Sequence, residues 1–344
     1  MAQLIEQNPY RGIIKPVQEE GPRPLWSVMI PAYNCAGYLR ETLSSVLVQD
    51  PGPDLMQIEV VDDHSTEDDP AAVVDELGQG RVGFYRQAQN VGHTRNFETC
   101  LQRSRGKLIH LLHGDDYVLD GFYRRLQPAF EEHPEIGAAF CRHIYMDEHD
   151  HWLGFSGLEQ QESGILIDWL ERIAITQRIQ TPSIVLRREV YENLGGFDHR
   201  LSWAEDWEMW VRVAAHYQFW YEVQPSAAYR MHSASNTRKY VRTGENIRDI
   251  RRAINIIQGY LPKTRIDELS NLSREHWALY ALDLAEQMLA KGDTAGAFAQ
   301  IKEAIKCRLS LKVAASALPL LPRTGRRWIR QTVRGRLSWG NLWV

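Results

Sequence analysis

Three acidic dipeptides are the residues best suited to chemistry in this chain. They are Asp62-Asp63, Asp115-Asp116 and Glu205-Asp206. Carboxylates gathered at one place repel one another unless a cation lies among them, and their oxygens are ligands that Mg²⁺ and Mn²⁺ prefer. The first two pairs therefore predict a divalent-metal site if the fold brings them together. The third pair lies between Trp203 and Trp207, and an apolar setting strengthens a carboxylate as a base by raising its pKa.

An alternation of strand and helix patterns over residues 25–135 is able to bring the first two pairs together. The strand patterns cover 25–30, 58–61, 82–85 and 108–112, and the helical patterns cover 38–48, 70–77 and 94–102. Such alternation predicts an α/β fold with a mainly parallel sheet flanked by helices. Ligands of an open sheet of this type bind beyond the carboxyl ends of its strands. Both aspartate pairs follow strands, so we expect them on one rim.

The pattern changes after residue 135 and again near residue 240. Strands are predicted at 136–145, 183–186, 219–223 and 227–231, and helices near 203–210 and at 246–260, 272–289 and 295–305. The segment 277–306 has the small residues of one tetratricopeptide-type hairpin. One hairpin is no repeat array, so a helical appendage on the main domain is the preferred interpretation. Thr66 and Asp68 are the candidate caps of the helix at Pro70.

The near-neutral charge of the chain hides an uneven distribution. The 344 residues carry 40 Lys and Arg against 44 Asp and Glu, a formal net charge of −4. Nine of the basic residues and none of the acidic ones lie in residues 306–344, so the first 305 residues carry 31 against 44. The basic segment 322–344 also contains three tryptophans, which is typical of an interfacial membrane contact. A merely solvated tail is the alternative.

The remaining composition limits the class of protein. An apolar content of 44% is ample for a core, and the length allows roughly two domains of about 150 residues. Residues 1–24 contain no apolar signal-peptide segment, and no stretch reaches the roughly 18 apolar residues of a spanning helix. The four cysteines form no CxxC motif, which argues against a zinc ribbon or a disulfide scaffold. We therefore expect a cytoplasmic protein, peripheral on the inner face of the membrane if its tail binds lipid.

Seven ordered motifs between residues 25 and 235 resemble those of the inverting family 2 glycosyltransferases, which have a nucleotide-sugar-binding domain of the GT-A type. The motifs are Ser27–Asn34, Glu59–Thr66, Asn90-Val91-Gly92 with Arg95-Asn96, His113–Asp116, Gly195–Asp198, Glu205-Asp206 and Tyr229–His232. The resemblance implies an enzyme that moves one sugar from a nucleotide-sugar donor, with UDP favoured, to an acceptor hydroxyl.

The resemblance assigns donor binding to the ends of the strands. Pro31, Tyr33 and Asn34 match the nucleotide-binding end of the first strand, and Asp62 and Asp63 match residues that accept hydrogen bonds from base or ribose. The other expected donor-binding residues are Arg95, His113, Asp116 and Arg230. The structural alternatives are a buried tyrosine, a helix-capping aspartate and, for Arg95, a surface salt bridge.

A metal site and a base follow from the same resemblance. Asp115 and Asp116 match the family's acidic metal-binding motif, and His232 is expected to complete the coordination of Mn²⁺ or Mg²⁺. The chain departs from the family's pattern at His113, which stands where that motif usually begins with an aspartate. Asp206 is the expected catalytic base, and Glu205 the residue that assists it. The alternatives are a solvated acidic loop, a structural histidine and acids that match a helix dipole.

These expectations divide the chain into five parts. They are an arm at 1–24, a nucleotide-sugar-binding half at 25–135, an acceptor-binding half at 136–240, a helical region at 241–321 and the tail at 322–344. The expected partners are the donor, a glycan or glycolipid acceptor of cell-surface polysaccharide assembly and an anionic membrane, with no nucleic acid. A sugar nucleotidyltransferase and a non-catalytic scaffold built on the helical region are the alternatives. The former lacks support because no Gly-rich loop follows the first strand.

Overall fold

The computed structural model describes residues 8–18, 21–232 and 236–321. The chain forms two compact units, the first from residues 1–173 and 177–233 and the second from residues 174–176 and 234–344. Among the described residues, no helix is long and apolar enough to cross a membrane. The predicted tail at 322–344 lies outside the described residues.

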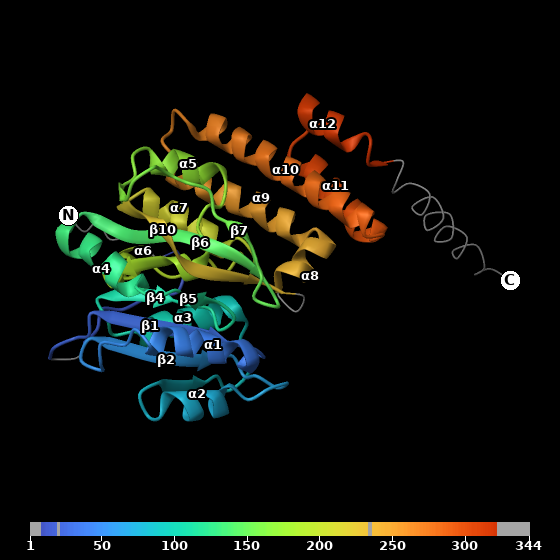
Figure 1. The fold of residues 1–344 in the computed structure, drawn as a ribbon. Coiled ribbons are helices and arrows are strands. Elements are labelled where there is room, and N and C mark those ends of the chain that lie inside the picture. Colours follow the sequence, from blue (N-terminus) through green and yellow to red (C-terminus); the bar gives the residue numbers. More distant parts are fainter. Residues whose placement is uncertain (1–7, 19–20, 233–235, 322–344) are drawn as a thin grey trace. The chain divides into compact units, whose positions relative to one another are not determined.

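The first unit is built on a ten-stranded sheet, whose main path runs β3-β2-β1-β4-β9-β6-β10-β5 (Figure 1). Its strands are β1 (Trp26–Ala32), β2 (Met56–Asp62), β3 (Gly83–Arg86), β4 (Leu108–Leu111), β5 (Tyr117–Val118), β6 (Ile136–Asp147), β7 (Trp152–Phe155), β8 (Gly164–Ile165), β9 (Ile184–Arg187) and β10 (Gln218–Met231). The pairs among β1 to β4 are all parallel. The expected mainly parallel sheet is therefore confirmed for the half that holds both aspartate pairs.

The second half of the sheet is mixed. Strand β9 is antiparallel to both β4 and β6, whereas β6 and β10 are parallel. The two strands predicted at 219–223 and 227–231 are one strand, β10, with register shifts on both sides of Pro225. Proline has no N–H to donate to a ladder, and a bulge accommodates it without ending the strand.

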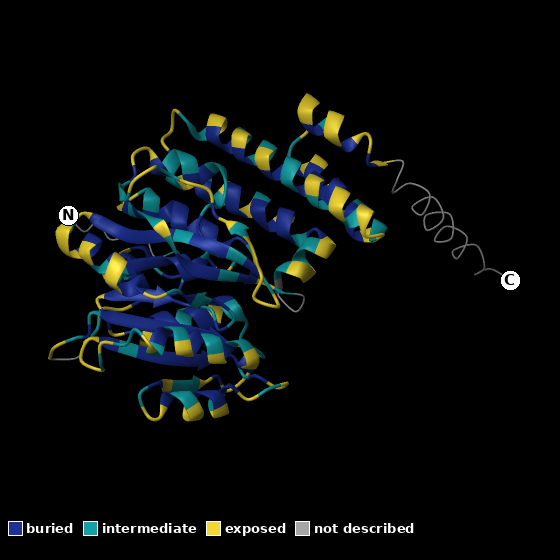
Figure 2. Cartoon of the chain, viewed as in Figure 1, coloured by how far each residue is buried: buried dark blue, intermediate teal, exposed yellow. Residues whose placement is uncertain are grey.

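Helices cover both faces of this sheet, and the central strands β1, β2, β4 and β9 are largely buried (Figure 2). They are α1 (Ala36–Leu47), α2 (Pro70–Gly78), α3 (His93–Arg103), α4 (Phe122–Glu132), α5 (Trp169–Ile175), α6 (Arg188–Leu194) and α7 (Glu205–Ala214), with the 3₁₀ turn η1 (Thr181–Ser183). Val28 and Ile30 of β1 pack in one core cluster with Leu39 of α1. Met29 is buried outside that cluster, because successive side chains of a strand point to opposite faces.

One sequence expectation about helix caps is wrong. The cap of α2 is Asp69, whose side chain accepts from the N–H groups of Ala71 and Ala72. Asp68 caps a different helix, because its Oδ2 accepts from the N–H of Ala36 at 2.6 Å at the start of α1. Neither predicted residue caps α2: the N–H of Thr66 donates to Asn34 Oδ1, and Asp68 reaches the start of α1.

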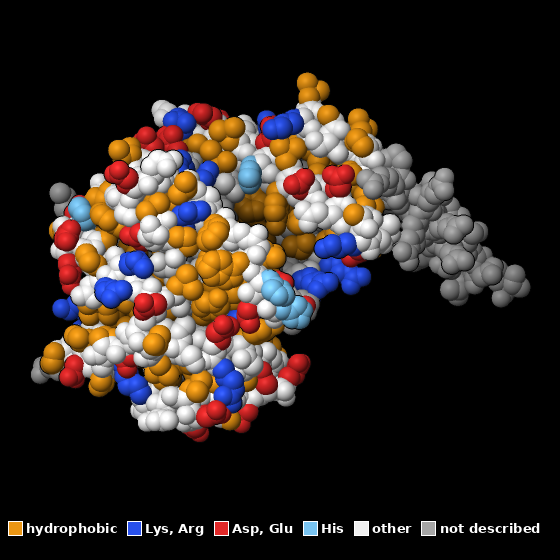
Figure 3. All heavy atoms as spheres, in the orientation of Figure 1, with side chains coloured by type: hydrophobic (Ala, Val, Ile, Leu, Met, Phe, Trp, Pro, Cys, Tyr) orange, Lys and Arg blue, Asp and Glu red, His pale blue; other side chains and the backbone are white. Residues whose placement is uncertain are grey.

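The predicted arm at 1–24 packs on the first unit where it is described. Ile14 is buried, Arg11 forms a bridge with Asp198, and the carbonyl of Lys15 accepts from Arg188 Nη2 at 2.9 Å. Elsewhere on this unit, β7 carries large exposed side chains, Trp152 among them, and hydrophobic atoms gather over β6 and β7 in Figure 3.

The second unit is helical in its described part. Its elements are α8 (Asn236–Thr243), α9 (Glu245–Ile257), η2 (Gln258–Tyr260), α10 (Ile266–Ala290), α11 (Thr294–Cys307) and α12 (Leu311–Ala317). Helices α10 and α11 contact each other closely, with Ala281, Ala285 and Ala297 fully buried. Small side chains let helix axes approach, which explains the alanine-rich pattern of this segment.

Candidate active site

The turn between β4 and β5, which we call the acidic turn, consists of residues 113–116. His113, Asp115 and Asp116 each offer one ligand atom, and these atoms lie within 4.8 Å of one another. Gly114 fits here because a Cβ would lie 2.9 Å from Cys35 Sγ and 3.2 Å from the carbonyl oxygen of Pro31. A glycine thus allows the turn to press against the end of β1.

The carboxylate of Asp116 is suited to be a ligand of a cation. It is buried, its Oδ1 accepts from the N–H of Arg230 at 2.8 Å, and its Oδ2 is buried without a hydrogen-bond partner among the described residues. Burial, and then the charge of Asp115, raise the pKa of Asp116 well above its usual range. A bound divalent ion would satisfy Oδ2 and favour the ionised form.

Asp115 and His232 form a second part of the same centre. His232 Nε2 lies 2.9 Å from Asp115 Oδ2, and His232 Nδ1 is buried with no partner in the described part of the chain. Burial pushes the pKa of Asp115 up, but the hydrogen bond with His232 and the charge of His113 outweigh it and lower that pKa. The donor set of carboxylates and imidazoles fits Mn²⁺ or Mg²⁺.

Arg230, one of the expected donor-binding residues, contacts several groups of the protein. Its side chain is 2% exposed, its Nε donates to the carbonyl of Asp115 at 2.9 Å, and its two Nη atoms contact Asp150 and Glu41. The guanidinium also lies over the ring of Tyr38. Through these contacts, Arg230 supports the acidic turn.

The residues predicted at the ends of β1 and β2 mostly hold loops. Asn34 has a left-handed backbone (φ 49°), and its Oδ1 accepts from the N–H groups of Thr66 and Glu67. Asp62 accepts from Ser65 Oγ at 2.5 Å. Pro31 is buried in β1, whereas Tyr33 is 47% exposed beside it. Of these side chains, that of Tyr33 is accessible to a ligand.

Asp63 positions the loop that leads into α3. Its two carboxylate oxygens accept from the N–H groups of Val91 at 2.7 Å and Gly92 at 2.9 Å. Burial outweighs these hydrogen bonds and raises the pKa of Asp63. Arg95, on the first turn of α3, is exposed. The hydrogen bonds of Asp63 explain how this loop is held at the same rim as the acidic turn.

Asp206 is the second residue of α7, and both of its carboxylate oxygens accept hydrogen bonds. Its Oδ2 accepts from Gln177 Nε2 at 2.7 Å, and its Oδ1 accepts from the N–H of Trp207 at 2.6 Å. Burial, and then the neighbouring charge of Glu205, raise the pKa of Asp206 to about 8. Trp207 is buried in the core, where its Nε1 donates to the carbonyl of Ile173. Trp207 therefore contributes to the apolar setting of Asp206.

Glu205 is tuned in the opposite direction by a residue that the sequence reasoning missed. Glu205 Oε1 lies 3.1 Å from His93 Nε2. Burial opposes ionisation of Glu205, but the charge and hydrogen bond of His93 outweigh it and lower the pKa of this carboxyl. Gln177 was also missed. The only sequence signal for His93 is its place directly after Gly92, and Gln177 has none.

Several buried polar atoms at this rim lack hydrogen-bond partners in the described residues. They are His113 Nε2, Asp116 Oδ2, Gln177 Oε1, Glu205 Oε2 and His232 Nδ1. Unsatisfied buried polar groups are rare in folded proteins, and a ligand is one explanation for them. Other atoms of this kind lie elsewhere in the described residues, but these five belong to the metal-ligating cluster, to His232 beside it, and to Glu205 and Gln177 at Asp206, which makes this rim the candidate site.

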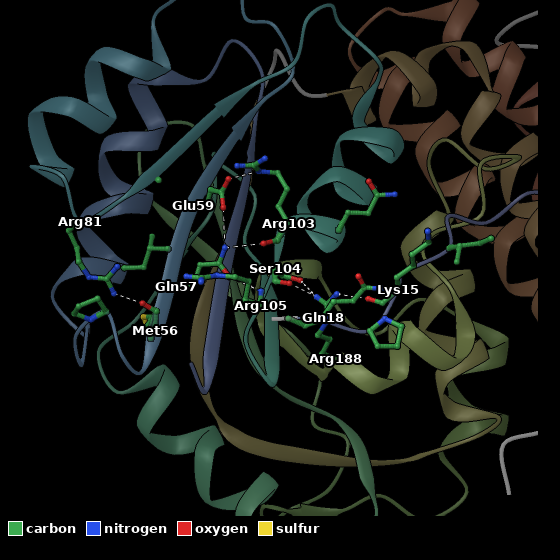
Figure 4. Close-up of a pocket in the computed structure, with 17 residues that line it drawn as sticks. Lys15, Gln18, Met56, Gln57, Glu59, Arg81, Arg103, Ser104, Arg105 and Arg188 are labelled. Carbon is green, nitrogen blue, oxygen red and sulfur yellow. Dashed lines mark hydrogen bonds and ion pairs between the residues drawn. The ribbon is translucent and has the colours of Figure 1, made fainter. Parts of the chain in front are cut away.

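A cavity of about 1080 Å³ lies elsewhere in the first unit (Figure 4). Its lining includes Met56, the first residue of β2, and Arg103 at the end of α3. The strands begin at this edge, so the cavity is at the opposite end of the parallel strands from the acidic turn. None of the predicted site residues line it.

Comparison with protein families identifies the class. The model of the family "Glycosyl transferase family 2" matches residues 27–195. An uncharacterised protein of Mycobacterium tuberculosis is 28% identical over 67% of this chain and 75% of its own length. An uncharacterised glycosyltransferase of Rickettsia typhi is 23% identical over 62% of this chain and 66% of its own length. Residues 27–195 therefore form a glycosyl transferase family 2 domain, and the protein is an enzyme of the glycosyltransferase class.

Solved structures agree on the fold. TarS 1–349 of S. aureus in complex with UDP-GlcNAc superposes with a TM-score of 0.57 at 16% identity, covering 81% of this chain and 88% of that one. The mannosyltransferase PcManGT of Pyrobaculum calidifontis, in complex with GDP-Man and Mn²⁺, gives 0.54 at 17% identity, covering 94% and 86%. The chain spans 50% of a longer TarS structure. These likenesses confirm the expected GT-A fold.

Proposed function

We propose that the protein transfers one sugar from a nucleotide-sugar donor to an acceptor hydroxyl, with inversion at C1 of the sugar. The observation that carries this proposal is the pairing, at one rim, of a carboxyl poised as a base with a set of metal-ligating side chains. The hydroxyl attacks C1 from the face opposite the diphosphate as the bond from C1 to the diphosphate breaks. Asp206 takes the proton of that hydroxyl, and its pKa of about 8 suits this role.

Mn²⁺ or Mg²⁺, held by the acidic turn, would supply positive charge for the departing diphosphate. His113, Asp115 and Asp116 are the proposed ligands, and His232 joins them through its contact with Asp115. The orphaned Oδ2 of Asp116 supports this assignment. The Mn²⁺ in the PcManGT complex supports it by analogy.

For the donor we favour a UDP-sugar, because TarS binds UDP-GlcNAc, although PcManGT binds GDP-Man. In this proposal the ring of Tyr33 stacks on the base and Arg95 binds the phosphates, and the exposure of both side chains supports these roles. Asp63 and Asn34 shape the loops on which the nucleotide would lie. The proposed acceptor is a glycan or glycolipid of cell-surface polysaccharide assembly, with membrane contact through residues 322–344.

A screen of nucleotide sugars tests this proposal. Thermal unfolding and donor hydrolysis are measured for UDP-, GDP- and dTDP-sugars, each with Mn²⁺ and with EDTA. A bound donor raises Tm because it binds only the folded state. We expect one nucleotide class to raise Tm and to be hydrolysed in Mn²⁺ but not in EDTA. The absence of both effects for every donor would refute the proposal.

A further inference from the structure

His93, which lies outside the motif residues, joins the start of α3 to the start of α7. It is the first residue of α3 and follows Gly92, whose N–H is held by Asp63 Oδ2 at 2.9 Å. Its Nε2 lies 3.1 Å from Oε1 of Glu205, the first residue of α7. The contact therefore fixes the beginnings of two helices against each other at the rim of the sheet.

The His93 ring also belongs to an aromatic row that ends at the acidic turn. The rings of His93 and Phe97 have centroids 5.6 Å apart at an interplanar angle of 65°. Phe97 stacks on His113, with centroids 5.0 Å apart at 18°, and Phe197 packs edge-on against Phe97. The row connects Glu205 to the acidic turn through side chains in direct contact, so a shift of His93 would be felt at both centres.

One of the two carboxylate oxygens of Glu205 has no hydrogen-bond partner in the described residues. His93 occupies Oε1, whereas Oε2 is buried without a partner in the described part of the chain. Gln177 repeats this pattern, since its Nε2 donates to Asp206 and its Oε1 is buried and unpartnered. Glu205 Oε2 and Gln177 Oε1 are both hydrogen-bond acceptors. Glu205 directly precedes Asp206 in the chain, and Gln177 contacts Asp206. A sugar hydroxyl can donate to such atoms, whereas a carboxylate or a phosphate is repelled by them.

We propose that His93 is a positioning residue, which holds Glu205 so that its free oxygen accepts a hydrogen bond from a hydroxyl of a neutral sugar beside Asp206. This inference rests on the proposed function and adds a substrate class to it. The acceptor sugar beside Asp206 therefore carries neutral hydroxyls at this position, and neither the carboxylate of a uronic acid nor a phosphate. His93 itself acts through Glu205.

Two variants of His93 separate positioning from packing. His93→Phe keeps an aromatic ring against Phe97 and removes the Nε2 donor, whereas His93→Gln restores a donor at similar reach. The matched control is His199→Phe, because His199 Nε2 lies 2.8 Å from Glu98 Oε2 and its side chain is 28% exposed, against 27% for His93. All are assayed with Mn²⁺ and the donor that the screen selects, on aryl glycosides of neutral sugars and of glucuronic acid.

We expect the wild type to prefer neutral glycosides, and His93→Phe to lower kcat/KM for transfer by about 10- to 100-fold, as loss of an orienting partner commonly does. Donor hydrolysis, in which water replaces the sugar hydroxyl, should fall less than transfer. His93→Gln should recover most of the activity, and His199→Phe should resemble the wild type. Equal losses in His93→Phe and His199→Phe, no recovery in His93→Gln, or a preference for the glucuronide would overturn the inference.

A double-mutant cycle reports on the contact without turnover. The changes in Tm of His93→Phe and Glu205→Ala should combine to less than their sum in the double variant, because the two residues share one interaction. Strict additivity would overturn the inference even in an active enzyme. A wild type that neither transfers nor hydrolyses any nucleotide sugar would instead refute the proposed function, and the cycle would still decide whether His93 holds Glu205.

Discussion

The acidic turn and the start of α7 each contain two adjacent carboxyl groups whose pKa values are driven apart. In each pair a histidine lies against one member, His232 against Asp115 and His93 against Glu205, and the pKa of that member is lowered. The pKa of the other member, Asp116 or Asp206, is raised by burial and by its ionised neighbour. The same arrangement thus occurs twice at one rim.

The two pairs differ in what their raised member still lacks. Both oxygens of Asp206 accept hydrogen bonds from the protein, which hold the carboxylate in place, whereas burial and the charge of Glu205 increase its proton affinity. Asp116 has one buried oxygen with no hydrogen-bond partner among the described residues, although His113 Nδ1 lies 3.8 Å from it. The first condition suits a group that takes a proton, and the second suits a group that binds a cation. The difference between the pairs, more than their shared acidity, supports the roles proposed for them.

The strongest test of this comparison is Asp206→Asn, which keeps the size of the side chain and removes the base. We expect kcat for transfer to fall by about 10² to 10⁴, the usual contribution of a general base. Donor affinity, measured by thermal shift in Mn²⁺, should stay near that of the wild type, because the acidic turn is unchanged. Transfer within a few-fold of the wild type at saturating donor would remove Asp206 from the role of base.

Removal of the metal addresses the other pair. EDTA should lower transfer by about 100-fold or more, because a cation on the leaving diphosphate contributes several kcal/mol to the transition state. Added Mn²⁺ should restore activity. Asp115→Asn should weaken the response to Mn²⁺, whereas Asp50→Asn, a control at the Arg81 ion pair, should not. Full activity of the wild type in EDTA would show that the acidic turn needs no cation for transfer. The proposed difference between the two carboxyl pairs would then be wrong.

Local sequence patterns predict which residues lie at this rim of the sheet. They do not predict the contacts that distinguish the two carboxyl pairs. The period of the apolar residues locates β1, β2 and β4, and the rule for parallel sheets then brings Asp62 and Asp115 to one edge. The match of His93 with Glu205 joins segments more than a hundred residues apart, and no pattern along the chain encodes it. The same holds for Arg230, whose contacts with Asp150 and Glu41 depend on the tertiary fold.

The pH dependence of transfer should separate Glu205 from Asp206. Transfer needs ionised Asp206, so kcat/KM should rise with pH until the pKa of about 8 is passed. Glu205→Gln removes the negative charge that helps to raise this pKa, so the rise should move to lower pH. The measurement is a pH profile of kcat/KM at a fixed Mn²⁺ concentration. A profile that moves to higher pH, or stays in place, would show that Glu205 does not set the basicity of Asp206.

The smallest expected effect concerns stability. The pKa of Asp206 is higher in the folded state than its ordinary value near 3.8, so the folded state binds this proton more tightly and loses stability as pH rises between these two values. Asn carries no such proton. The free energy of unfolding of Asp206→Asn relative to the wild type should therefore grow from about pH 4 and level off above about pH 8, by roughly 1–3 kcal/mol after allowance for solvent screening. Urea titrations at pH 5, 7 and 9 measure this difference in the free energy of unfolding.

Asp147→Asn is the control, and its stability change should have the opposite sign. Hydrogen bonds from the His151 and His149 segment lower the pKa of Asp147, so removal of this carboxylate should lower stability at neutral pH.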